Sequence, residues 1–279
     1  MLKHSFIHIP GVGRRTEKKL WKTGLSTWDD FTVCHGGVGK QLSNRMFCHL
    51  EQSRTALAKG QLGWFLEHLP ASESWRVLNH SPATTAYLDI ETTGLFRGVD
   101  HITTVALYDG RSLKTYVRGQ NLRSLASDLR NYSLIVTYNG KCFDLPFIED
   151  DLKFKITIPD VDLRYLCASL RWTGGLKQVE SDLGLKRPRA LSLLTGFDAP
   201  ILWDKHCKGN PKALPTLLAY NCADVVSLRT IAQMVFNANL TSKQRNLRLA
   251  VDSPNYSSPH KPDLKLINQM KKEFFDDGF

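Results

Sequence analysis

The segment that most constrains the fold is residues 84–91, a β-type run that carries two acids and ends shortly before Gly94. Successive side chains of a strand point to opposite faces, so Asp89 and Glu91 project from the same face. Two carboxylates this close repel each other unless a cation lies between them. Hard cations such as Mg²⁺ bind carboxylate oxygens. The pair therefore indicates a metal site, although a solvated strand face explains it equally well on its own.

Three predicted strands come first, and a helix, a fourth strand and then mostly helices follow them. The predicted strands are residues 84–91, 101–108, 113–118 and 134–138. The predicted helices are residues 122–130, 163–171, 176–183 and 211–236. This order predicts an α/β fold with a mixed sheet flanked by helices. Residues 187–209 are rich in Pro, Gly and Lys and are predicted to be a long connection that borders the site.

The N-terminal region has a different pattern, which predicts a small all-α domain. A turn at Gly11-Val12-Gly13 leads into a helix at residues 14–22, and Arg14, Arg15 and Lys18 surround the turn. Free backbone N–H groups at such a turn, together with a helix N-terminus, form an anion site. The segment resembles the hairpin of helix-hairpin-helix modules, which bind the nucleic-acid backbone, although its first helix is short or missing. The alternative is an ordinary turn at the start of a domain.

The net charge supports a polyanionic partner. The chain carries a formal charge of +10, of which +6 falls within residues 1–60. A positive charge concentrated in one region favours binding to nucleic acid, although a solvated basic surface gives the same count. We therefore predict a nucleic-acid-binding module at 1–60, a connector at 61–83, an α/β domain at 84–236 and a polar tail at 237–279. Further helices are predicted at 38–58, 61–69 and 263–275.

Composition excludes several classes of protein. No run approaches 18 apolar residues, so no membrane span is expected. The N-terminus has no apolar signal segment, and the six cysteines form no CxxC pair, so a cytoplasmic protein with reduced thiols is predicted. Cys34-His35 and Cys48-His49 match no common zinc-finger spacing, and no metal is assigned to them.

Three further residues complete a possible site. Asp144 follows the strand at 134–138, where it could simply cap a helix. Tyr220 and Asp224 are four residues apart on the predicted helix at 211–236 and share one face of it. Each of these residues has an ordinary structural explanation when it is considered separately.

Taken in order, the residues resemble a known family. Asp89-x-Glu91, Asn139-x-x-x-Phe143-Asp144 and Tyr220-x-x-x-Asp224 are similar to the three motifs of the DEDD exonuclease superfamily, tyrosine subtype. The surrounding LDIETTGL, TYNGKCFDLPF and LKQVE segments look most like the YprB-type RNase H-like domain. They are also similar to the proofreading domain of family B DNA polymerases. The resemblance covers about residues 84–236.

The resemblance implies two-metal hydrolysis of phosphodiester bonds from the 3′ end, with Mg²⁺ or Mn²⁺ as the cofactor. It assigns Asp89 to both ions, Glu91 and Asp224 to the ion beside the attacking water, and Asp144 to the ion at the leaving group. Tyr220 would orient that water, because an ordinary tyrosine pKa near 10 makes it a poor base. A two-ion site of this kind stabilises both the attacking and the leaving oxygen.

The expected partner is nucleic acid, with single-stranded DNA favoured over RNA. Contacts are expected from the hairpin residues and from residues beside the motifs, which are Thr92, Thr93, Gly94, Leu95, Asn139 and Phe143. Leu95, Phe96 and Phe143 are candidates for stacking on bases, although core packing explains them equally well. Two alternatives remain: a nucleic-acid-binding protein with an inactive nuclease fold, and an endonuclease or RNA-processing nuclease that uses the same site.

Overall fold

The computed structural model describes residues 1–32 and 39–276, with the backbone alone for 274–276. Its centre is a five-stranded mixed sheet in the order β3-β2-β1-β4-β5. β2 pairs antiparallel with β1 and β3, whereas β4 pairs parallel with β1 and β5. The strands are β1 (Thr85–Thr92), β2 (Ile102–Tyr108), β3 (Leu113–Val117), β4 (Leu134–Thr137) and β5 (Asp160–Asp162). The predicted α/β fold with a mixed sheet is confirmed.

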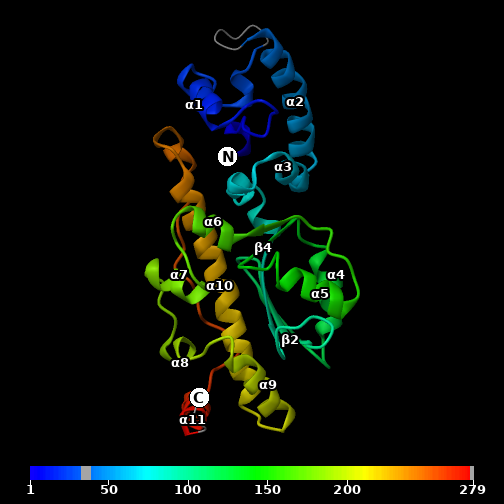
Figure 1. Ribbon diagram of the computed structural model, residues 1–279, viewed down its shortest axis with the longest axis vertical. Coiled ribbons are helices and arrows are strands. Elements are labelled where there is room, and N and C mark those ends of the chain that lie inside the picture. The colour runs from blue at the N-terminus through cyan, green and yellow to red at the C-terminus, as the bar shows by residue number, and fades with distance from the viewer. Residues whose placement is uncertain (33–38, 277–279) are drawn as a thin grey trace.

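Two hydrophobic cores cover the two faces of β1. Ala86, Leu88 and Ile90 belong to the core beneath α4 (Leu125–Leu129) and α5 (Asp144–Leu152). Tyr87 belongs to the other core, which contains the apolar side chains of α10 (Ala213–Asn239). Asp89 and Glu91 alternate with the first set, so they lie on the α10 side. Figure 1 shows α10 running along one side of the sheet, with α4 and α5 on the other.

The N-terminal region is helical, and the sheet lies below it in Figure 1. Its elements are the 3₁₀ turns Leu2–His4, Trp28–Asp30, Ala71–Val77 and Pro82–Thr84, and the helices α1 (Arg14–Lys22), α2 (Lys40–Ala58) and α3 (Leu62–His68). Its apolar residues belong to the same core as α10, and the Trp75 ring contacts the Phe236 ring at 5.7 Å. Residues 1–60 are therefore packed against the rest of the chain.

A buried ion network fixes the start of α1. The Arg76 guanidinium donates to both oxygens of Glu17 at 2.8 Å and to Glu73 at 2.8 Å, and all three side chains are almost fully buried. Glu17 also accepts the backbone N–H groups of Phe6 and Ile7 at 2.7 and 3.0 Å. Charges that are paired in this way satisfy each other's hydrogen bonds. The network turns the only acid of α1 inwards and leaves the exposed charges of this helix positive.

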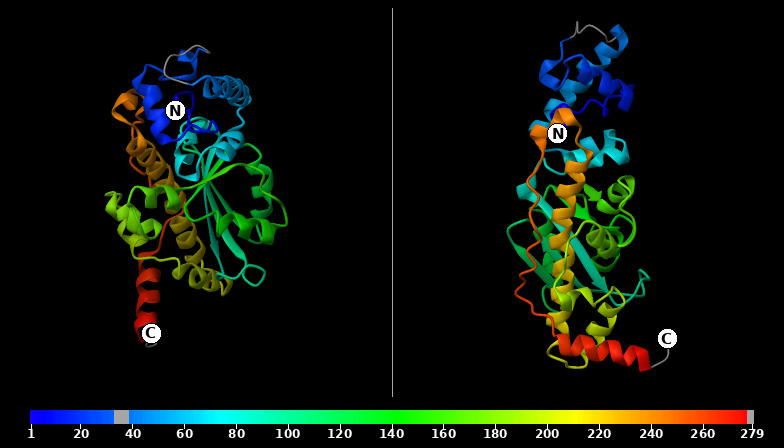
Figure 2. Two further views of the ribbon diagram at one scale, coloured as in Figure 1. Left: turned by 45° about the horizontal axis from the view of Figure 1, so that its top comes forward. Right: turned by 90° about the vertical axis from the view of Figure 1, so that its left-hand side faces the viewer.

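The remaining helices follow β3 along the chain. They are the short 3₁₀ turn Leu122–Ser124, α6 (Leu163–Ser169), α7 (Leu176–Asp182), α8 (Arg189–Ser192), α9 (Asp198–Cys207), the 3₁₀ turn Ser242–Leu247 and α11 (Leu264–Asp276). Figure 2 shows α11 at the end of the molecule opposite the N-terminal helices. The segment predicted as a long connection at 187–209 contains two helices, α8 and α9, and four of its residues, Thr195, Gly196, Phe197 and Pro200, border the cavity described below. Pro200 sits in the first turn of α9, where a missing N–H costs little.

Within residues 1–32 and 39–276, no helix is long and apolar enough to cross a membrane. Cys34 and His35 lie outside the described residues, as does the predicted start of α2 at Val38.

Candidate active site

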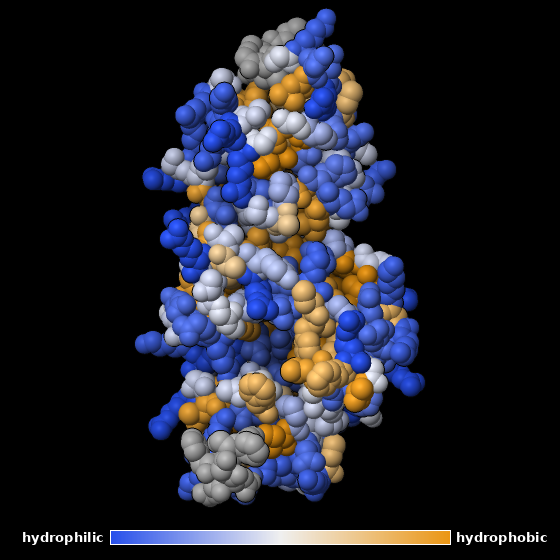
Figure 3. Space-filling view, in the orientation of Figure 1, coloured by the Kyte–Doolittle hydropathy of each residue, from blue (hydrophilic) through white to orange (hydrophobic). Residues whose placement is uncertain are grey.

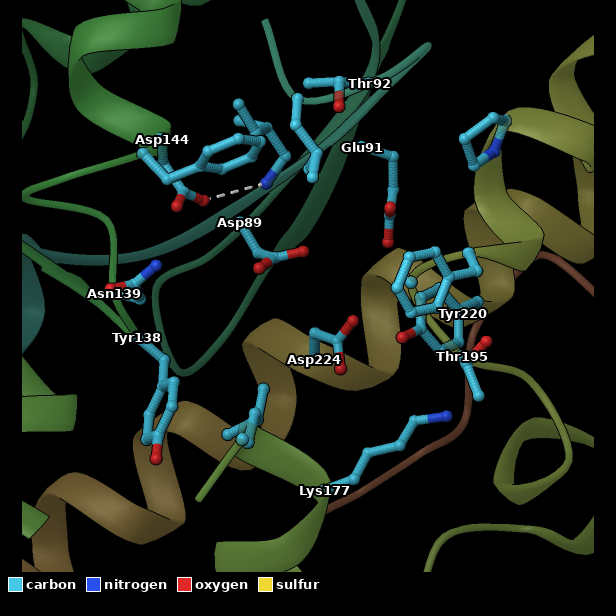
Figure 4. A pocket seen from close by; sticks show the side chains of 18 of the residues that line it. Asp89, Glu91, Thr92, Tyr138, Asn139, Asp144, Lys177, Thr195, Tyr220 and Asp224 are labelled. Atoms are coloured by element: carbon cyan, nitrogen blue, oxygen red, sulfur yellow. Dashed lines mark hydrogen bonds between the residues drawn. The ribbon is translucent and has the colours of Figure 1, made fainter. Parts of the chain in front are cut away.

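Three carboxylates converge where β1 meets α10. Asp89 and Glu91 come from β1 and Asp224 from α10, and one carboxylate oxygen from each lies within 4.8 Å of the others. Glu91 and Asp224 are buried, whereas Asp89 is partly exposed. Tyr220 lies one turn before Asp224 on α10, and its ring faces the same opening (Figure 4). The structure thus brings together residues that are separated by more than 130 positions in the chain.

Asp144 reaches the cluster from the opposite side of β1. It is the first residue of α5 and is buried, and its Oδ1 accepts the backbone N–H of Ile90 at 3.2 Å. That bond ties the start of α5 to β1 between Asp89 and Glu91. Figure 4 shows the carboxylate of Asp144 next to that of Asp89. The predicted four acids are therefore neighbours, with Asp144 outside the closest group of three.

Asn221 orients Asp89, a contact that the sequence motifs did not indicate. Its amide donates to Asp89 Oδ2 at 2.7 Å and to the Asp89 backbone oxygen at 3.3 Å. Its own oxygen accepts the hydroxyl of Thr104 at 3.2 Å. Asn221 is fully buried, and a polar residue at a buried helix position is the one signal that could have revealed it.

Arg187 is the second residue that sequence reasoning missed. Its guanidinium binds both oxygens of Glu180 at 2.6 Å and also donates to Asp224. The side chains of Arg187 and Glu180 are 4% and 3% exposed, so this is a buried ion pair attached directly to the acidic cluster. Lys177 adds a second cation, with its Nζ 4.8 Å from the centre of the Tyr220 ring. Two cations thus partly balance five carboxylates, which are the four predicted acids and Glu180.

Burial and mutual repulsion disfavour ionised acids here. Burial, together with the carboxylates of Asp224 and Asp144, raises the pKa of Asp89 and of Glu91 well above their usual values. Burial raises the pKa of Asp144 to about 7, even though the Ile90 N–H bond opposes the shift. Burial and the charge of Asp224 raise the pKa of Tyr220 as well, so its phenol stays protonated at neutral pH. Such a cluster of oxygen donors can be stabilised by protons or by hard divalent cations.

These pKa shifts predict how stability depends on pH. An acid whose pKa is higher in the folded chain binds protons more tightly when folded, so the free energy of unfolding falls as pH rises between its two pKa values. For Asp144 this interval runs from 3.8 to about 7. We expect thermal unfolding in EDTA to occur several degrees lower at the upper end of this interval than at its lower end. The slope should be smaller in Asp144→Asn. A wild-type stability that falls no more steeply across the interval than that of the variant would contradict this expectation.

A cavity of about 520 Å³ opens onto the acidic cluster. Five of the residues predicted to contact nucleic acid line it: Thr92, Gly94, Leu95, Asn139 and Phe143. Thr93 instead donates its hydroxyl to Asp100 at 3.1 Å. Leu95 is 69% exposed, and Phe197 of the α8–α9 loop, which was not predicted, also lines the cavity and is 82% exposed. On the face drawn in Figure 3, a patch of hydrophobic side chains lies in the lower half, right of centre, and other such patches lie in the upper half.

The turn predicted to bind the nucleic-acid backbone lies at a separate cavity. Gly11, Val12 and Gly13 line a second cavity, of about 570 Å³, among the N-terminal helices. Val12 is buried, and Gly11 has a φ of +89°, which favours glycine. Arg15 and Lys18 are exposed, whereas Arg14 is paired with Glu73 at 2.6 Å. Arg14 therefore holds the turn to the connector in addition to any role in binding.

The fold and the site together define an α/β domain with a carboxylate-lined cavity at the edge of its central strand. Residues 86–236, more than half of the chain, match the model of the RNase H superfamily. The chain belongs to this superfamily, and these residues form its nuclease-type domain. A search of curated proteins finds no match.

Two solved structures resemble parts of the chain. The family B DNA polymerase of the hyperthermophilic archaeon Pyrobaculum calidifontis aligns over 57% of this chain with 18% identity and a TM-score of 0.42. The match covers only 26% of the polymerase chain. A structure described as the apo form of a nuclease aligns over 70% of this chain and 87% of its own, with 17% identity and a TM-score of 0.41.

Proposed function

We propose that this protein is a metal-dependent 3′→5′ exonuclease of the DEDD superfamily, tyrosine subtype, with a YprB-type domain. The observation that carries the proposal is the convergence of Asp89, Glu91 and Asp224, with Asp144 and Tyr220 beside them, at the mouth of one cavity. The superfamily membership supports hydrolysis of nucleic acid. The 3′→5′ polarity rests on the motif resemblance.

The acidic cluster fits divalent cations. Three carboxylate oxygens lie within 4.8 Å of one another, and the pKa values of Asp89 and Glu91 are raised by their proximity and burial. We propose that Asp89, Glu91, Asp144 and Asp224 hold two ions, Mg²⁺ or Mn²⁺. When bound, the ions would supply electrostatic stabilisation of the attacking and leaving oxygens.

Tyr220 is proposed to act as a hydrogen-bond donor. Burial and the neighbouring acids keep its phenol protonated, because they raise its pKa. A protonated phenol cannot remove a proton from water, but it can orient a water molecule or a phosphate oxygen. The cations of Lys177 and Arg187 lie 4.8 and 5.8 Å from its ring and hold that ring in place.

We propose that the nucleotide at the 3′ end occupies the 520 Å³ cavity. Leu95 and Phe143 line this cavity and would offer apolar surface to an unpaired base, while the backbone of Thr92 and Gly94 and the amide of Asn139 would face the sugar and phosphate. Asn139 has a φ of 68°, and its side-chain oxygen accepts from Arg164 at 2.6 Å, so its position is fixed. An unpaired end fits such a site better than a duplex, and we favour DNA over RNA as the substrate.

The direct test is digestion of DNA and RNA labelled at the 3′ or 5′ end, both single- and double-stranded, with Mg²⁺ and Mn²⁺. We expect mononucleotides to be released from the 3′ end of single-stranded DNA. Cleavage of a circular single strand would instead favour an endonuclease. Binding of nucleic acid without cleavage or uptake of divalent ions would support an inactive nuclease fold.

We also propose that residues 1–60 form a helix-hairpin-helix-like module that holds the nucleic-acid backbone through the Gly11–Gly13 turn, Arg15 and Lys18. The positive exposed face of α1 supports this role. Residues 61–83 would act as the connector and residues 237–279 as a C-terminal extension.

Binding should respond to salt in proportion to the number of phosphate contacts. Replacing Arg15 and Lys18 by Ala should reduce the slope of log affinity against log salt by about 2, since each lost contact removes about 1. Fluorescence anisotropy of a labelled oligonucleotide measures this slope. Arg123→Ala/Arg130→Ala, which removes two exposed charges beside α4, is the matched control. An equal change in both double variants would mean that the hairpin is not the binding site.

A further inference from the structure

One wall of the active-site cavity is the loop that joins α8 to α9. Thr195, Gly196 and Phe197 of this loop line the cavity together with Tyr220. Figure 4 shows Thr195 beside Tyr220, on the side of the cavity away from Asp144. The position of this loop therefore helps to define the space beside the acidic cluster.

A buried carboxylate helps to hold the loop, in addition to the backbone N–H groups of Asp198 and Ala199, which donate to the carbonyl oxygens of Thr195 and Gly196. Asp198, the first residue of α9, accepts the backbone N–H of Thr195 at 2.6 Å and its hydroxyl at 2.8 Å, both on Oδ2. Asp198 is only 2% exposed. A carboxylate buried to this degree needs a counter-ion to remain charged.

The counter-ion comes from the C-terminal helix. Lys271 of α11 donates to both oxygens of Asp198 at 2.7 Å. The apolar face of α11, formed by Leu266, Ile267 and Met270, is buried in the same core as Tyr220. α11 thus contacts the site twice: through the ion pair with Asp198 and through the core behind Tyr220.

A second ion pair joins α11 to α9 without touching the loop. Lys205 of α9 binds Glu273 of α11 at 2.9 Å, seven residues after Asp198 along α9. The two pairs connect the same two helices, but only the pair with Lys271 reaches the cavity wall. Removing each pair in turn therefore distinguishes an effect of α11 docking, which both pairs support, from an effect on the loop, which only Lys271 contacts through Asp198.

We infer that α11 helps to shape the substrate site, with Lys271 as a positioning residue for the Thr195–Phe197 wall. This helix lies outside the segment that matches the RNase H superfamily. The ligand held by this wall is the nucleotide next to the phosphodiester to be cut, so the inference rests on the proposed function. Phe197 would contribute apolar surface to that nucleotide, and Lys271 fixes its loop without contacting the substrate.

The test compares Lys271→Met with Lys205→Met in the full chain. Lys271→Met should raise KM for a single-stranded oligonucleotide about tenfold and change kcat by less than about twofold, because part of the contact with the base is lost. Hydrogen exchange of the peptide that contains Thr195 should accelerate in the same variant. Lys205→Met should change neither readout, even if it lowers the melting temperature equally. Lys271→Arg, which keeps the cation, should retain the wild-type KM.

A binding measurement without turnover separates this inference from the proposed function. Dissociation constants for the oligonucleotide, measured in an Asp89→Asn background, provide a readout without turnover. If the wild-type protein binds the oligonucleotide but does not cut it, the proposed function is wrong. The dissociation constant of Lys271→Met/Asp89→Asn, compared with that of Asp89→Asn alone, still tests the inference. Unchanged KM, affinity and exchange in Lys271→Met would overturn it, as would equal changes in Lys205→Met. If Lys271→Met fails to fold, Lys271→Gln, which keeps a donor towards Asp198, takes its place with a smaller expected effect. Absence of binding by the wild-type protein would overturn both proposals.

Discussion

Replacing Asp89 by Asn should reduce divalent-ion-dependent hydrolysis by about 1000-fold, because several kcal/mol of electrostatic stabilisation would be lost and each 1.4 kcal/mol is worth tenfold in rate. Asp89 is the acid that lies between the others: it faces Asp224 and Glu91 on one side and Asp144 on the other. The substitution keeps the shape of the side chain and an oxygen that can accept the Asn221 amide bond. The fold should therefore be retained.

Two measurements distinguish this loss from general damage. The metal-free variant should be at least as stable as the wild-type protein at neutral pH, because one of several repelling carboxylates is gone. Calorimetric titration with Mn²⁺ should show weaker binding. Asp182→Asn, which neutralises an exposed acid on neighbouring α7, serves as the control and should keep full activity. Full activity in Asp89→Asn would show that hydrolysis does not depend on the acidic cluster.

The central part of this site could be predicted because strand and helix periodicities fix which side chains share a face. Alternation along β1 places Asp89 and Glu91 together, and the four-residue spacing on α10 does the same for Tyr220 and Asp224. Those local rules do not say that the two faces meet. The order of the motifs along the chain predicted that these two faces meet. In the structure α10 packs across the sheet and brings Asp224 to Asp89 and Glu91.

The supporting residues could not be predicted, because their partners are set by tertiary packing. Nothing near Arg187 indicates that it binds Glu180 and Asp224, since a basic residue in a Pro- and Lys-rich segment usually faces solvent. β5 has only three residues, too few to show a period. The sequence predicted a helix at 263–275, but it could not show that Leu266, Ile267 and Met270 are buried against α9 and α10, because that contact is set by tertiary packing.

Replacing Arg187 by Met should destabilise the protein by about 3–5 kcal/mol, the usual effect of removing one partner from a buried ion pair. Glu180 is almost fully buried and would lose both of its bonds to the guanidinium, while Asp224 would lose a donor. Urea unfolding in EDTA at neutral pH measures the change. Mn²⁺ should stabilise this variant more than the wild-type protein, because a bound cation replaces the missing charge beside Asp224. The melting temperatures of both proteins at saturating Mn²⁺ measure this difference.

A second substitution separates stability from activity. Arg187→Met/Glu180→Leu removes both members of the buried pair, so most of the lost stability should return. Hydrolysis should remain about 10- to 100-fold below that of the wild-type protein, because Asp224 would still lack the group that orients it, and outer partners of metal-binding side chains typically contribute this much. Recovery of both stability and activity in the double variant would show that Arg187 only compensates Glu180. Recovery of stability alone would identify Arg187 as the residue that positions Asp224.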